Sequence, residues 1–75
     1  MTVLFINNAG AGFTHYVEAK EGITIDAFLA VQLGEDYKAE NYLIRVNLSQ
    51  PAARDQVLHD GDRVSATPTK IEGAL

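Results

Sequence analysis

The 75-residue sequence predicts a single α+β domain, with one mixed sheet of four to five strands packed on one helix. Three observations predict this fold class. Two β-prone runs flank a turn that contains glycine, an apolar segment at helical spacing follows, and an alternating segment after an Asp-Gly-Asp turn ends the chain. Elements of these kinds bury their apolar sides by forming two layers. We expect residues 1–69 to form the domain and residues 70–75 to form a flexible tail.

The first two strands are predicted to form a hairpin. Residues 2–7 (TVLFIN) are a nearly continuous apolar run of strand length, and residues 13–19 (FTHYVEA) are β-prone and alternate in character. The turn between them holds two glycines, Gly10 and Gly12. A phosphate-binding loop would need a helix directly after such glycines. A strand follows instead, which favours a hairpin turn.

One helix is predicted after the hairpin. Thr24 is a candidate N-cap, Asp26 lies in the first turn, where the helix dipole favours an acidic side chain, and Gly34 supplies the stop. Apolar residues recur between these signals at helical spacing, namely Ile25, Phe28, Leu29 and Leu33. A single apolar stripe of this kind is typical of a helix that packs across a sheet.

The third strand is predicted over residues 42–47 (YLIRVN). Placing Arg45 towards solvent turns Leu43 outward and turns Tyr42, Ile44 and Val46 inward. Residues 48–56 include Pro51 and are predicted to be an irregular loop, followed by a short strand or turn at residues 56–58.

The last strand follows the turn Asp60-Gly61-Asp62, in which glycine supplies a positive φ. Val64, Ala66 and Pro68 should point one way, with Arg63, Ser65, Thr67 and Thr69 pointing the other way. Pro68 cannot donate a ladder hydrogen bond, so the strand should lose its partner there. This strand is best placed beside the first, in the centre of the sheet. The resulting order, ββαβ(β)β, is that of the β-grasp or ubiquitin-like roll.

Composition excludes most catalytic and metal chemistry. The chain has no cysteine, which excludes disulfides, zinc–thiolate sites and cysteine nucleophiles and fits a reducing cytoplasm. His15 and His59 have no companions at metal-ligand spacing. No paired carboxylates or activated nucleophile can be assembled. We therefore expect a carrier or binding protein with no catalytic site, metal or cofactor of its own.

The charge points to protein partners. A net charge of −4 with six scattered basic residues argues against nucleic acid or an anionic membrane, and favours a partner with a basic surface. No signal peptide or membrane-spanning segment is expected, because Met1 leads directly into a short strand. The expected state is a cytoplasmic protein that is monomeric when free.

Three parts of the sequence match a known pattern, namely residues 43–47 (LIRVN), residues 57–64 (VLHDGDRV) and Pro68. Through them the chain resembles the small sulfur-carrier proteins of the ThiS/MoaD family, and the resemblance covers nearly the whole chain. That family has a Val-Asn pair closing the third strand and a Leu-x-Asp-Gly-Asp-x-Val motif opening the last one. It supplies sulfur in thiamine and molybdopterin biosynthesis, and it works through an exposed C-terminal Gly-Gly. A ThiF/MoeB-like partner enzyme adenylates the terminal carboxylate, which then becomes a thiocarboxylate.

The resemblance assigns roles to the C-terminal tail. Gly73 would be the residue that bears the thiocarboxylate, and the segment that threads into the partner would be Lys70, Ile71 and Glu72. The family's two glycines align with Glu72 and Gly73, so only the second is present, and Ala74-Leu75 extend past it. The carrier function therefore requires a protease to remove Ala74-Leu75.

The alternative hypothesis is a ubiquitin-fold interaction module whose tail does no acyl chemistry. The first strand is apolar on both sides, so one of its pairs must face away from the helix. The candidate docking patch on that sheet face consists of Leu4, Ile6, Leu43 and Arg45. An ordinary solvent-facing sheet with scattered apolar residues is the other interpretation of the same pattern.

Overall fold

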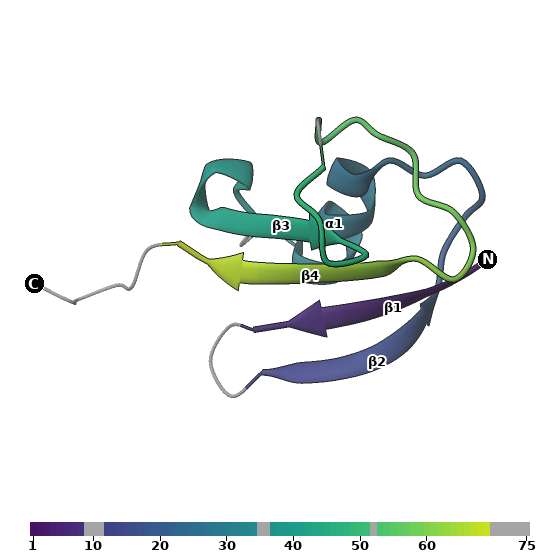
Figure 1. Ribbon diagram of the computed structural model, residues 1–75, viewed down its shortest axis with the longest axis horizontal. Helices are drawn as coiled ribbons and strands as arrows, with labels where there is room; N and C mark the ends of the chain where they lie inside the picture. The colour runs from purple at the N-terminus through teal and green to yellow at the C-terminus, as the bar shows by residue number, and fades with distance from the viewer. Residues whose placement is uncertain (9–11, 35–36, 52, 70–75) are drawn as a thin grey trace, which may run out of the picture.

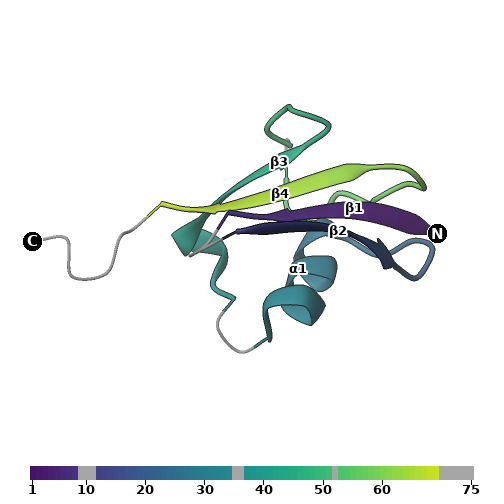
Figure 2. The same ribbon diagram turned by 90° about the horizontal axis from the view of Figure 1, so that it is seen from below.

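A computed structural model describes residues 1–8, 12–34, 37–51 and 53–69 of the chain. The elements are β1 (Thr2–Asn7), β2 (Phe13–Glu18), α1 (Ile25–Leu33), a short 3-10 helix (Ala39–Asn41), β3 (Tyr42–Val46) and β4 (Arg63–Pro68). The four strands form one sheet in the order β2-β1-β4-β3 (Figure 1). Helix α1 covers one face of this sheet, and no helix or strand of the described residues covers the other face (Figure 2).

The sheet is mixed, as the sequence predicts. The central strands β1 and β4 are parallel, with Leu4 opposite Arg63 and Phe5 opposite Val64. The outer pairs β1–β2 and β3–β4 are antiparallel. The final strand therefore lies beside the first, which confirms the predicted topology.

Local signals set the ends of α1. The Thr24 hydroxyl accepts a hydrogen bond from the backbone N–H of Ala27, as expected of an N-cap. Gly34 ends the helix with φ = 66°, and its N–H donates to the carbonyl of Ala30. This left-handed conformation is why glycine stands there. The helix predicted from the sequence is thus confirmed at both ends.

The core lies between α1 and the helix-facing side of the sheet. Its buried members are Val3, Phe5, Ile25, Phe28, Leu29, Ile44, Val46, Leu58, Val64 and Ala66. The rings of Phe5 and Phe28 meet edge to face, with their centroids 5.7 Å apart. The alternation predicted for β3 and β4 is confirmed, because Ile44 and Val64 are buried while their strand neighbours are not.

The possible fifth strand is reduced to a single bridge. Val57 pairs with Thr24 in an isolated antiparallel bridge, and Leu58 donates to the carbonyl of Ile23 at 2.9 Å. The segment before the Asp-Gly-Asp turn is therefore tied to the start of α1 and does not join the sheet. No helix in the described part of the chain is long and apolar enough to cross a membrane.

Candidate functional site: the open face of the sheet

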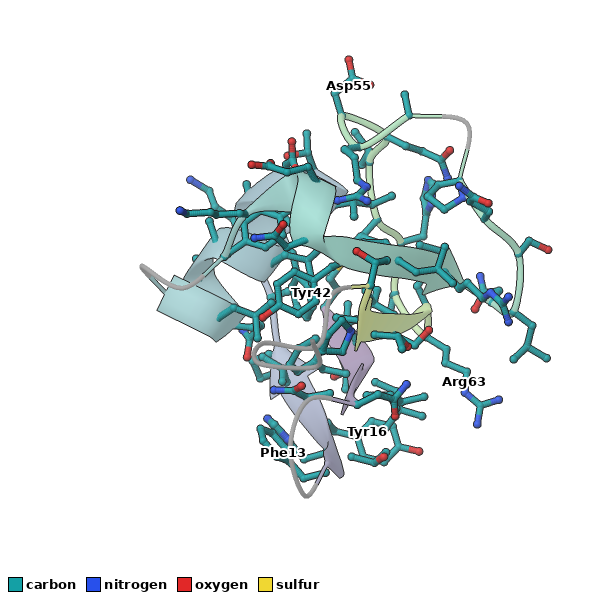
Figure 3. The ribbon with its side chains drawn as sticks, turned by 90° about the vertical axis from the view of Figure 1, so that its left-hand side faces the viewer. Phe13, Tyr16, Tyr42, Asp55 and Arg63 are labelled. Atoms are coloured by element: carbon teal, nitrogen blue, oxygen red, sulfur yellow. The ribbon has the colours of Figure 1, made fainter. Side chains whose placement is uncertain are left out.

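The candidate site is the sheet face that α1 leaves uncovered, which we call the open face. Strand pairing fixes its membership, since directly paired residues point to the same side. Its members are Thr2, Leu4 and Ile6 from β1, Thr14, Tyr16 and Glu18 from β2, Leu43 and Arg45 from β3, and Arg63, Ser65 and Thr67 from β4. Figure 3 shows Tyr16 and Arg63 on this side of the sheet and Phe13 on the helix side.

The pairing arranges the open face in rows that cross the strands. Tyr16, Leu4 and Arg63 lie opposite one another in the first row. The second row runs from Thr14 through Ile6 and Ser65 to Arg45, and in the third Thr67 lies opposite Leu43. The face therefore mixes aliphatic, aromatic, hydroxyl and guanidinium groups.

The four residues of the predicted docking patch do lie on this one face. Leu4, Ile6 and Leu43 are partly exposed, and Arg45 is exposed. They do not form one continuous apolar patch, because β4 separates β1 from β3 and places polar side chains between them. Two strand spacings of about 4.8 Å divide the β1 members from the β3 members.

Sequence reasoning missed the contributions of β2 and β4 to this face. Tyr16 is 74% exposed and lies beside Leu4, and Arg63 lies on the other side of the same leucine. The alternation of β4 and its predicted place next to β1 together imply that Arg63 lies on the open face. The same alternation places Tyr16 there once the pairing of β1 with β2 is known.

The charge of the open face is opposite to that of the whole chain. The net charge is −4, yet Arg45 and Arg63 are both exposed here, and neither forms an ion pair with a described residue. They occupy diagonal positions on β3 and β4, since Arg45 pairs with Ser65. Diagonal neighbours lie about 7–8 Å apart. The basic partner expected from net charge therefore does not suit this face, which complements acidic groups.

Glu18 is the acidic member of the open face, and its carboxylate already has partners at the start of the chain. Its Oε1 accepts a hydrogen bond from the Thr2 hydroxyl at 2.7 Å, and its Oε2 lies 3.9 Å from the terminal amine of Met1. Within the described residues no group of three His, Cys, Asp or Glu side chains could hold a metal ion.

The residues that carry the family resemblance form a structural junction between β3 and β4. Asn47 adopts φ = 53°, and its side-chain amide donates to Asp62 Oδ1 at 3.0 Å. Its side-chain oxygen accepts from the N–H of Arg63 at 3.0 Å. Asp62 also accepts from the N–H of His59 at 2.8 Å.

The Asp-Gly-Asp turn ties this junction to β1. Asp60 accepts from the N–H of Thr2 at 2.8 Å, and Gly61, with φ = 84°, donates to the carbonyl of Thr2 at 2.8 Å. Every residue of the turn thus has a role in holding strands together. The signature specifies the fold and does not by itself specify sulfur chemistry.

A second polar cluster is also structural. The Tyr37 hydroxyl donates to Asp26 Oδ1 and accepts from Arg54 Nη1 at 3.2 Å, while Arg54 Nη2 donates to the carbonyl of Tyr42 at 2.8 Å. These bonds join the start of α1, the segment before β3 and the loop after it. Burial, followed by the hydrogen bond to Asp26, raises the pKa of the Tyr37 phenol above its ordinary value.

The tail residues assigned by the resemblance lie outside the described part of the chain. These are Lys70, Ile71, Glu72 and Gly73, together with Ala74-Leu75. The last described residue, Thr69, donates from its N–H to the carbonyl of Asn41 at 2.9 Å. The sheet pairing of β4 ends at Pro68, opposite Tyr42, as the sequence predicts.

Comparison with known proteins establishes the fold. No protein-family model matches the chain, and no curated protein matches it in sequence. Among solved structures, the chain is similar to a ubiquitin-like protein from the hyperthermophilic archaea Caldiarchaeum subterraneum, with a TM-score of 0.67 and 13% sequence identity. The alignment covers 95% of this chain and 99% of the other. The ubiquitin-like β-grasp fold is thereby confirmed.

Proposed function

We propose that this ubiquitin-like chain is a non-catalytic protein-interaction module that docks through the open face of its sheet. The supporting observation is that Arg45 and Arg63 are exposed among partly exposed aliphatic side chains and form no ion pair with any described residue, in a chain of net charge −4. Arginine and tyrosine are enriched at protein interfaces and among the residues that contribute most to binding. Tyr16 supplies the aromatic member beside them.

The chemistry of this face defines the partner. A protein surface with an apolar centre and nearby carboxylates would bury Leu4 and Ile6 while pairing with the two guanidinium groups. The diagonal placement of the arginines allows one acidic segment to meet both. The complementary charges would mainly raise the association rate and select the partner.

A charge reversal tests this proposal. Tagged wild-type protein, Arg45→Glu/Arg63→Glu and a control that reverses one charge elsewhere, Lys38→Glu, are used to recover partners from the native cells. Lys38 is exposed and lies outside the sheet. The proposal requires a partner that is retained by wild type and control, is lost with the double variant, and binds less tightly as salt rises. Equal recovery by all three proteins would contradict it.

The second candidate function is that of a sulfur carrier. It is supported by the resemblance in residues 43–47 and 57–64 and by the presence of Gly73 shortly after the central strand β4. Gly73 is four residues beyond Thr69, so an extended chain reaches at most roughly 13–14 Å from the sheet. An adenylating enzyme held on the open face could take up a segment of that reach. Glycine suits the reaction because a Cβ would crowd attack on the acyl-adenylate.

The intact mass of the untagged protein from its native cells tests the carrier function. A species ending at Gly73, with or without sulfur replacing one carboxylate oxygen, would support it. A chain that ends only at Leu75 would contradict it, because Gly73 would then have no free carboxylate. In the same system Gly73→Val should abolish adenylation by a ThiF/MoeB-like enzyme while leaving the circular dichroism spectrum unchanged.

A further inference from the structure

The two edges of the sheet differ in how their backbone groups are hydrogen-bonded. At the β3 edge, backbone N–H and C=O groups point away from the sheet at Tyr42, Ile44 and Val46, because the residues next to them bond to β4. The Tyr42 carbonyl accepts from Arg54 at 2.8 Å. The backbone of Val46 exchanges hydrogen bonds with Ser49. The loop after β3 therefore bonds to this edge at Tyr42 and at Val46.

The β2 edge is open. Met1 and Ala19 exchange backbone hydrogen bonds of 2.9 and 2.8 Å, so the odd-numbered residues of β2 bond to β1. Thr14, Tyr16 and Glu18 must then direct their backbone N–H and C=O groups away from the sheet. In the described part of the chain no hydrogen bond reaches these groups. The strand also has no proline, and its register with β1 is continuous, so it lacks two devices that protect natural edges.

We propose that β2 pairs antiparallel with β2 of a second copy of this chain, with Tyr16 opposite Tyr16 on the two-fold axis. This register places Thr14 opposite Glu18 of the second copy, and the reverse. The backbone groups that Thr14, Tyr16 and Glu18 direct outward then form three residue pairs, and two hydrogen bonds join the residues of each pair. The result is one continuous sheet across both copies, and each open face keeps its arginines. The interface is isologous, as two-fold symmetry requires.

The side chains on the open face suit this register. Thr14 and Glu18 both point to that face, so the threonine hydroxyl can donate to the carboxylate across the seam. No like charges lie directly opposite one another. The two Tyr16 rings, each 74% exposed in the single copy, would meet at the axis.

The side chains on the helix side of the two paired β2 strands also fit this register. Phe13 is 53% exposed, lies on the helix side of β2 and stacks on His15 with centroids 5.0 Å apart. The register brings it opposite Ala19 of the second copy. Ala19 lines an apolar groove of about 310 Å³ between β2 and α1, together with Ile23, Phe28 and Val31.

The groove has room for this ring. A cavity of about 150 Å³ lined by apolar side chains accommodates benzene. Two-fold symmetry would place one Phe13 in each groove and would cover Val31, which is 72% exposed in the single copy. The contact is short and would bury less than about 1,200 Å², the range of weak or transient interfaces. The proposal thus replaces the expected monomer with a dimer that forms at high concentration.

The test uses charge at position 14 of the full chain. Thr14→Glu places like charges opposite Glu18 twice in the dimer and should weaken self-association about two- to thirty-fold. Thr14→Lys places opposite charges there and should strengthen it by a similar factor. Matched controls are Lys38→Gln and Asp55→Asn, which change net charge equally at exposed positions outside β2. Thr14 is exposed, so neither variant should disturb the fold, which circular dichroism checks.

Sedimentation velocity over a concentration series measures the dissociation constants. The expected result is self-association of the wild type, opposite shifts for the two Thr14 variants, and little shift for the controls. At high concentration the amide protons of Thr14, Tyr16 and Glu18 should exchange more slowly. A wild type and a Thr14→Lys variant that both stay monomeric at the highest soluble concentration would overturn the proposal. Self-association that responds equally to both Thr14 variants would overturn it as well.

Discussion

Replacing Asn47 should test whether the family signature is structural. Asn47→Ala removes two side-chain hydrogen bonds, each 3.0 Å long, one to the Asp62 carboxylate and one from the N–H of Arg63. Each exposed bond contributes about 0.5–1.5 kcal/mol to stability. Alanine at φ = 53° adds about 1–2 kcal/mol of backbone cost. The expected loss in the free energy of unfolding is therefore about 2–5 kcal/mol.

This loss is large for so small a domain. At 0.05–0.15 kcal/mol per residue, a chain of 75 residues has a total stability of about 4–11 kcal/mol. With a urea m-value of about 1 kcal/mol/M, the midpoint of unfolding should fall by about 2–5 M. Asn47→Gly should be milder by about 0.5–1 kcal/mol, because glycine accepts the left-handed conformation but raises the entropy of the unfolded chain.

Asn8→Ala is the matched control for the urea measurement. Asn8 makes one side-chain hydrogen bond, to the Thr67 hydroxyl at 2.9 Å, and its φ is not positive. Its replacement should cost no more than about 1.5 kcal/mol. A double-mutant cycle between Asn47→Ala and Asp62→Ala should show a coupling of at least about 0.5 kcal/mol. The reasoning is refuted if Asn47→Ala costs no more than Asn8→Ala, or if the cycle is additive.

Two further substitutions test the core and the polar cluster at α1. Phe28→Ala should lower the free energy of unfolding by about 3–5 kcal/mol through cavity formation, whereas Leu48→Ala, at a side chain 75% exposed, should change it by less than about 0.5 kcal/mol. Equal effects in urea unfolding would contradict the assigned core. The raised pKa of Tyr37 in the folded state means that its contribution is fully present below pH 10.0 and is lost as the pH rises through the folded value. Wild type should therefore lose stability more steeply than Tyr37→Phe above that pH, and parallel pH profiles would count against the bond to Asp26.

The elements of the fold were predictable because their signals are local. Thr24 and Gly34 set the helix ends through backbone bonds within a few residues, and the alternation of β4 assigned Val64 and Ala66 to the core. The place of β4 beside β1 followed from the order of the elements. The segment predicted as a short strand or turn at residues 56–58 does not join the sheet, because Val57 and Leu58 instead bond to the segment that enters α1.

The polar clusters were not predictable, because their partners are distant in sequence. Tyr37 bonds to Asp26 and Arg54, which lie 11 and 17 residues away. No local pattern marks these side chains as partners, and the loops that bring them together have no regular period. The alternation along β1 and β3 predicts which side of the sheet the docking-patch residues occupy, but the distance between them also depends on the strand order. With β4 between β1 and β3, Leu43 is separated from Leu4 and Ile6 by polar groups.

The same strand order changes what the family resemblance can support. Its quoted residues, Asn47 and the turn Asp60-Gly61-Asp62, hold β3, β4 and β1 together through their own side chains and backbone. Any β-grasp domain that joins these strands in this way gains from such residues, whether or not its C-terminus reacts. The proposed carrier function therefore depends on Gly73 and on its processing. The proposed docking function depends on Arg45 and Arg63, which are exposed and form no ion pair with a described residue. Substitution at Gly73 and reversal of the two arginines can therefore separate the two functions.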